Sequence, residues 1–165
     1  MQIVHTWGLF CEKTLEKRAG AIRAPAADMA NTPAEVEGLT EKIIGCAIEV
    51  HRILGPGLLE SVYRECLIIE LRREQLRVES ELHVSLDYKG HRIGGGLKLD
   101  LLVEGCIVVE LKAVERLHPV NLAQVISYLK ISGCPAGLLM NFNSTTLRAG
   151  LRRLDHPDRY VKKNS

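Results

Sequence analysis

Helical periodicity opens the patterned part of the chain. Between residues 40 and 54 apolar positions recur at steps of four, three and four, and Gly55-Pro56-Gly57 then interrupts the pattern. Thr40 is a suitable N-cap, so we predict a helix over 40–54. A second helix is predicted over 59–75, where apolar residues repeat at helical spacing while arginine and glutamate fill the other side.

From residue 78 the period changes to two, which is the repeat of a strand with one buried face. We predict a strand over 78–88, a tight turn and a short arm over 91–93. After a run of three glycines, which indicates a bend or bulge, a strand follows over 97–103. Another turn leads into a strand over 106–113, so these segments predict an antiparallel meander.

The last third of the chain returns to helical spacing over 118–131, and an apolar run over 136–142 predicts a short strand. Leucines at steps of four and three, with Ser144 as a cap, predict a final helix over 144–154. The order is therefore two helices, three or four strands, a helix, a strand and a helix. This succession predicts an α/β (α+β) fold with a mixed sheet flanked by helices.

The length of 165 residues suits one domain, and 46% apolar with 25% charged residues is ordinary for a folded protein. Residues 1–38 lack sustained periodicity, and we expect a mobile N-terminal extension there. The folded domain is predicted over 39–154 and a basic tail over 155–165. Because Met29 stands just upstream of the pattern, we hypothesise that residues 1–28 are a dispensable leader or a misassigned start.

Composition also excludes several classes of protein. No apolar run approaches the roughly 18 residues of a membrane-spanning helix, so no membrane partner is expected. The five cysteines form no C-x-x-C pair, which disfavours zinc and favours a reducing, cytoplasmic setting. The net charge of +2 neither requires nor excludes nucleic acid. A basic cluster over 148–163 is either a solvated helix end or a phosphate-contacting surface.

Two acidic residues on neighbouring predicted strands, Asp100 and Glu110, are the most informative polar positions. A two-residue loop between the strands would place them on opposite faces, whereas a three-residue loop or a bulge at Gly105 would pair them on one face. The apolar positions at 97–101 are expected to share a face with those at 109–111. We therefore predict the second register.

Paired carboxylates repel each other unless a cation or a proton lies between them. Oxygen ligands at such a spacing suit Mg²⁺ or Mn²⁺, which can activate a water molecule to attack a phosphate. Lys112, two residues after Glu110, could orient that water and offset the negative charge that develops on the phosphate. The alternative interpretation is an exposed charged face with ordinary Glu–Lys pairing.

Two helical features add weaker signals. Glu60 falls on one stripe with Tyr63 and Leu67, at the edge of a buried face where a carboxylate is costly unless it is paired or bound to a ligand. Gln124 and Tyr128 are four residues apart, and both can hydrogen-bond a phosphate or a metal-bound water. The ordinary interpretations are a helix-dipole partner for the glutamate and rim residues for the pair.

These motifs, in this order, resemble the GxxExxY protein family, a branch of the PD-(D/E)XK nuclease superfamily, over about residues 39–154. They are Gly57-x-x-Glu60-x-x-Tyr63, Lys98-Leu-Asp100, Glu110-Leu-Lys112 and Gln124-x-x-x-Tyr128. The resemblance implies a restriction-endonuclease-like αβββαβ core. Two departures stand out: Lys98 occupies a position where the family leads us to expect arginine, and the Gly94–Gly96 run is unusually rich in glycine.

By position, the resemblance also implies a role for each site residue. Asp100, Glu110, the main-chain carbonyl of Leu111 and Glu60 would hold the metal, and Lys112 would be the catalytic lysine. Gln124 and Tyr128, which form the last motif, would be the helix residues that line the site.

We therefore predict a Mg²⁺- or Mn²⁺-dependent nuclease that hydrolyses phosphodiester bonds in nucleic acid, with DNA preferred as the substrate class. The alternative hypothesis is a nucleic-acid-binding or assembly module that has the nuclease fold but does not cleave. In a third interpretation the carboxylates are structural and the partners are proteins. The sequence leaves open a homodimer or an unidentified protein partner.

Overall fold

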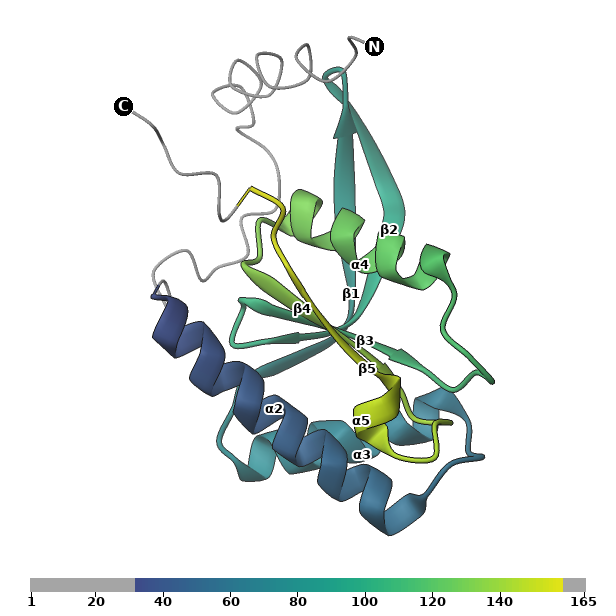
Figure 1. The fold of residues 1–165 in the computed structure, drawn as a ribbon. Helices are drawn as coiled ribbons and strands as arrows, with labels where there is room; N and C mark the ends of the chain where they lie inside the picture. The colour runs from purple at the N-terminus through teal and green to yellow at the C-terminus, as the bar shows by residue number, and fades with distance from the viewer. Residues whose placement is uncertain (1–31, 159–165) are drawn as a thin grey trace, which may run out of the picture.

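A five-stranded mixed sheet forms the centre of the computed structural model, which describes residues 32–158 (Figure 1). Its strands lie in the order β1-β2-β3-β4-β5; only β3 and β4 are parallel, and the other neighbours are antiparallel. The strands are β1 (Val78–Tyr88), β2 (His91–Val103), β3 (Ile107–Lys112), β4 (Ala136–Asn141) and β5 (Leu151–Asp155).

Helices cover both faces of this sheet, with α2 and α3 on one side and α4 on the other (Figure 1). They are α2 (Pro33–Leu54), α3 (Glu60–Arg73), α4 (Pro119–Ser132) and the short α5 (Leu147–Gly150). The order α3-β1-β2-β3-α4-β4 is the predicted αβββαβ succession, so the expected fold class is confirmed.

The first helix begins earlier than the sequence pattern predicted. Thr32 caps α2 through a capping box with Glu35, and Pro33 occupies the first turn, where its missing N–H is not needed. Thr40, the predicted cap, is instead buried, and its hydroxyl donates to the carbonyl of Val36 at 2.6 Å. Residues 32–38, assigned to the extension, therefore belong to the helix and its cap, while residues 1–31 lie outside the described residues.

The hairpin of β1 and β2 matches its sequence signals. Tyr88 pairs with His91, and the intervening Lys89 and Gly90 both have positive φ, as the tight two-residue turn requires. The register shifts between Val84 and Leu86, opposite the glycine run, which confirms the predicted bulge. The long hairpin extends beyond α4 (Figure 1).

One expectation about the faces of β2 is wrong. Leu101 packs in the core beneath α2 and α3, together with the apolar residues of β3 at 109 and 111, as expected. Leu97 and Leu99 pack instead in the second core beneath α4. The alternation of side chains changes at Asp100, where Glu81 on the paired strand has a φ of 52° and the ladder is interrupted.

The predicted helix over 144–154 is wrong except for one turn over residues 147–150. Only α5 is helical, with Thr146 rather than Ser144 as its N-cap, and residues 151–155 form β5 at the edge of the sheet. Pairing with β4 satisfies the main-chain groups of that edge, and the pairing overrides the local leucine spacing. Of the tail predicted over 155–165, residues 159–165 lie outside the described residues.

Candidate active site

The loop between β2 and β3 decides how the two carboxylates meet. Val103 pairs with Ile107 and Leu101 with Val109, so the loop has three residues, and its closing bond runs from Cys106 N to the carbonyl of Val103 at 3.0 Å. When this register is extended by one residue, Asp100 lies opposite Glu110. The register predicted from the sequence is therefore confirmed.

Asp100 is fixed against the neighbouring strand. Its Oδ2 accepts a hydrogen bond from the main-chain N–H of Leu111 at 2.8 Å. Leu111 itself is fully buried, between Glu110 and Lys112. The aspartate thus takes a main-chain donor of β3 at the point where the β2–β3 ladder ends, and its carboxylate lies beside Glu110.

Glu110 is almost completely buried, with a side chain only 3% exposed. Lys112 Nζ donates to Glu110 Oε1 at 2.6 Å, across the two residues that share a face of β3. The second oxygen, Glu110 Oε2, is buried and has no hydrogen-bond partner among the described residues. Because a buried carboxylate oxygen without a partner is costly, this atom indicates a missing ligand, such as a cation or a proton.

The electrostatics agree with that interpretation. The pKa of Glu110 is raised to about 7: burial is the largest cause, the Asp100 and Glu60 carboxylates act in the same direction, and the hydrogen bond and charge of Lys112 oppose them. Burial acts to lower the pKa of Lys112, but its hydrogen bond to Glu110 and the other nearby carboxylates outweigh burial and raise the pKa. The lysine therefore stays charged beside a carboxyl that titrates near neutrality.

Glu60 is brought to this cluster by the start of α3. Burial raises its pKa, as does the negative charge of Asp100, while Lys112 and Arg64 lower it. Glu60 therefore lies within electrostatic reach of Asp100 and Lys112, and its role at the site stays a prediction.

The tyrosine of the first motif fixes the turn that precedes Glu60. Tyr63 OH donates to the carbonyl of Gly55 at 2.6 Å and accepts from Leu58 N at 3.1 Å. Its fully buried ring stacks on Phe142 with 4.6 Å between the ring centroids. Gly57, which lies between Gly55 and Leu58 in the turn, has a φ of 104°, a backbone conformation that favours glycine. The role of Tyr63 in this structure is to hold the loop that places Glu60.

Gln124 and Tyr128 pair with each other on α4. Gln124 Nε2 donates to Tyr128 OH at 2.7 Å, and Tyr128 OH donates to the main-chain carbonyl of Lys98 at 3.1 Å. Burial raises the pKa of Tyr128; the bond from Gln124 opposes this, and Glu110 and Asp100 add to it. The pair therefore lies within electrostatic reach of the carboxylates and supports β2 two residues before Asp100.

Arg64 also belongs to this site, although its place in the sequence pattern predicts the solvated side of α3. Its side chain is only 16% exposed, with Nη1 3.8 Å from Asp100 Oδ1 and Nη2 3.5 Å from Glu81 Oε1. Lys98, found where arginine was expected, also pairs with Glu81, at 2.5 Å. The available signal was the spacing of four residues between Glu60 and Arg64, which places both on one helix face.

The donor set fits a hard divalent cation in part. Asp100 and Glu110 supply carboxylate oxygens beside each other, one of them without a partner, and Mg²⁺ commonly takes one or two protein carboxylates and keeps several waters. Within residues 32–158, however, no group of three or more histidine, cysteine, aspartate or glutamate residues is placed to hold a metal. Glu60 is thus near the pair without completing a preassembled three-residue ligand set.

Comparison with protein families decides the assignment. The sequence model of the PD-(D/E)XK nuclease superfamily matches residues 37–154, which include all of the site residues above. The chain belongs to the PD-(D/E)XK nuclease superfamily. Its restriction-endonuclease-like fold agrees with the observed sheet and flanking helices. Comparison with curated proteins and with solved structures gave no match.

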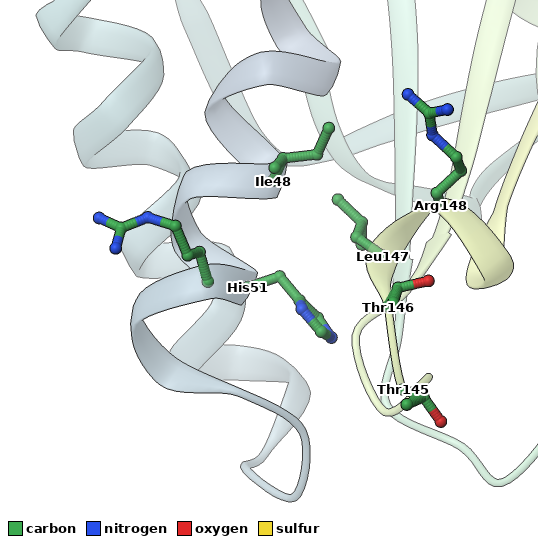
Figure 2. A pocket seen from close by; sticks show the side chains of 7 residues that line it. Ile48, His51, Thr145, Thr146, Leu147 and Arg148 are labelled. Carbon is green, nitrogen blue, oxygen red and sulfur yellow. The ribbon is translucent and has the colours of Figure 1, made fainter.

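Away from this site, a hollow lies between the end of α2 and the segment leading into α5. Figure 2 shows His51 on α2 facing Leu147 across it. The ring Nε2 of His51 lies 2.8 Å from the carbonyl of Ser144, so this histidine joins the two segments. The hollow is lined by residues outside the hairpin cluster: Ile48, His51, Arg52, Thr145, Thr146, Leu147 and Arg148.

The superfamily match leaves the cellular setting open, and one structural finding bears on membranes. In the described part of the chain, no helix combines the length and apolar character needed to cross a bilayer. The cytoplasmic setting and the GxxExxY branch stay predictions.

Proposed function

We propose that this protein is a Mg²⁺- or Mn²⁺-dependent nuclease of the GxxExxY branch that hydrolyses phosphodiester bonds in nucleic acid, with DNA as the preferred substrate. The observation that carries the proposal is the environment of Glu110. A carboxylate that is 3% exposed, next to Asp100 and hydrogen-bonded to Lys112, retains one oxygen without a partner. A cation at that oxygen would remove the cost of burying it.

In this proposal Asp100, Glu110 and the carbonyl of Leu111 hold the metal, with Glu60 as an additional carboxylate. When bound, Mg²⁺ would supply Lewis-acid chemistry, lowering the pKa of a coordinated water and polarising the phosphoryl group. The main-chain bond from Leu111 to Asp100 fixes the aspartate, so its carboxylate is oriented before any ligand arrives.

The remaining side chains act around that centre. Lys112 carries a positive charge that offsets the negative charge developing on the phosphate, and its bond to Glu110 holds the ammonium group in place. Gln124 and Tyr128 support β2 and border the site, where the amide and the phenol can orient a water or a phosphate oxygen.

A second candidate function is a nucleic-acid-binding or assembly module that does not cleave. One observation favours it: the described residues hold no preassembled group of three metal-binding side chains. Such a protein would still offer Lys112, Lys98 and Arg64 to a phosphate backbone. Its binding would weaken steeply with salt, as phosphate contacts do.

The deciding experiment is a cleavage assay on single- and double-stranded DNA and RNA with Mg²⁺ or Mn²⁺. Wild type is compared with Lys112→Ala and with Lys130→Ala, a matched control at an exposed position of α4. Metal-dependent cutting that is lost only in Lys112→Ala supports the nuclease. Absence of cutting by all three proteins, with salt-sensitive nucleic-acid binding retained, would favour the binding module instead.

A further inference from the structure

Arg64 has an environment that its protein contacts leave incomplete. Its Nε is buried and has no hydrogen-bond partner among the described residues. Its two ion pairs, to Asp100 at 3.8 Å and to Glu81 at 3.5 Å, are both at or beyond hydrogen-bonding distance. A guanidinium group has five N–H donors, and a buried donor without an acceptor is costly. The geometry therefore indicates an acceptor that the protein itself does not provide.

The position of Arg64 limits what that acceptor can be. The side chain extends from α3 one turn after Glu60 and approaches Asp100 on β2, so it borders the proposed metal site. A cation is excluded as its direct partner by charge. Arginine binds phosphate oxygens with its planar fork, and such bonds are short and strong because both groups are charged.

We infer that Arg64 is a phosphate-binding residue, which takes a phosphate oxygen of the substrate once a divalent cation is bound beside it. The inference deepens the proposed function, on which it rests for the identity of the substrate as nucleic acid. It adds a second positively charged phosphate contact to that function. Arg64 supplies this contact from α3, whereas Lys112 lies on β3.

The charges around Arg64 explain why the cation is required. When all are ionised, four carboxylates gather here against three cationic side chains, so the surroundings then repel an anion while the site is without metal. A divalent cation reverses the sign of the total. The carboxylates are Glu60, Glu81, Asp100 and Glu110, and the cationic side chains are Arg64, Lys98 and Lys112.

Nuclear magnetic resonance of the full chain gives a direct test, because a buried Nε–H exchanges slowly enough to be observed. The Arg64 Nε–H signal is assigned by its loss in Arg64→Lys. Inorganic phosphate is then titrated with and without Mg²⁺. Arg153 is an internal control, since its Nε is also buried without a hydrogen-bond partner, while its guanidinium pairs with Glu37 and Asp155 away from the hairpin.

The expected result is a saturable shift of the Arg64 signal with phosphate in the presence of Mg²⁺ and no comparable shift of Arg153. Arg64→Lys should weaken phosphate binding at least about tenfold, because it keeps the charge but loses the fork. A shift with Mg²⁺ alone that phosphate does not change would show that Arg64 acts only through Asp100. That outcome, or equal shifts of the two arginines, would overturn the inference.

A second arm separates nucleic acid from free phosphate as the ligand. Binding of a DNA duplex is measured against salt concentration for wild type, Arg64→Met and Arg73→Met, an exposed control on the same helix. Loss of one phosphate contact should reduce the slope of log K against log[salt] by about 0.9 in Arg64→Met only. An unchanged slope overturns nucleic-acid contact. A wild type that binds phosphate at Arg64 but cleaves nothing would refute the nuclease function and leave this inference standing.

Discussion

Lys112 and Glu110 lie two residues apart on β3, and Lys112 Nζ donates a 2.6 Å hydrogen bond to Glu110 Oε1. The bond satisfies one carboxylate oxygen and leaves the other without a partner. The pair therefore combines a charged lysine with a carboxyl whose pKa burial raises to about 7. Protonation of Glu110 and binding of a cation are alternative ways to relieve the same buried charge.

Stability should consequently fall as pH rises in the absence of metal. A carboxyl whose pKa is higher in the folded chain than in the unfolded chain binds its proton more tightly when folded. Its stabilising contribution is present below the ordinary value of 4.5 and is lost as pH rises to about 7. Between pH 4.5 and 8, the free energy of unfolding of wild type should fall by up to about 3 kcal/mol relative to that of Glu110→Gln, as measured by urea unfolding. Parallel pH profiles for the two proteins would contradict this.

Metal binding should require the negative charge of Asp100, whereas folding should not. Asparagine keeps an oxygen that can accept the bond from Leu111 N but removes the negative charge. Asp100→Asn should therefore fold normally and bind Mn²⁺ at least about tenfold more weakly, as measured by titration calorimetry. Asp87→Asn, near the end of β1, is the matched control, because Asp87 also accepts a main-chain hydrogen bond, from Gly90 N at 2.9 Å. Equal affinity in wild type and Asp100→Asn would remove the aspartate from the ligand set.

The sequence predicted the pairing of Asp100 with Glu110 because the apolar positions of the two strands were expected to share a face, and the observed register agrees with that prediction. One of the premises was nevertheless wrong, since Leu99 packs beneath α4 and Leu101 beneath α2 and α3. The reversal occurs at Asp100, opposite Glu81 with its positive φ. A local break in strand geometry of this kind leaves no trace in an apolar–polar pattern.

Other features depended on contacts between distant parts of the chain. Arg64 looks like a surface residue of α3 until Asp100 and Glu81 are brought beside it by the sheet. Residues 151–155 have leucine spacing that suits a helix, but the free edge of β4 makes them a strand. Periodicity reports which face of an element is buried, and it does not report which neighbour supplies the burial.

Tyr63 should be required for stability through its hydroxyl as well as its ring. Tyr63→Phe keeps the stacking on Phe142 and removes the bonds to Gly55 and Leu58, which leaves a turn carbonyl without its donor. We expect a loss of about 1–3 kcal/mol in the free energy of unfolding, measured with urea. Cleavage should fall further than the unfolded fraction explains, because the turn places Glu60. Tyr88→Phe, at an exposed site, should change neither quantity.

Gly150 should be intolerant of even a methyl group. A Cβ at this position would lie 2.3 Å from Ser144 Oγ and 2.5 Å from the carbonyl of Asn141, a main-chain atom that cannot rotate away. Because the surrounding backbone would have to shift, Gly150→Ala should cost about 1–3 kcal/mol in the free energy of unfolding. Gly45→Ala is the opposite case: it lies inside α2 with nothing within 4 Å of the added carbon, so it should stabilise the protein by about 0.5–1 kcal/mol. Urea unfolding of both variants tests whether Gly150→Ala lowers the free energy of unfolding and Gly45→Ala raises it. Equal stability of Gly150→Ala and wild type would mean that β5 and α5 do not pack on the end of β4 as described.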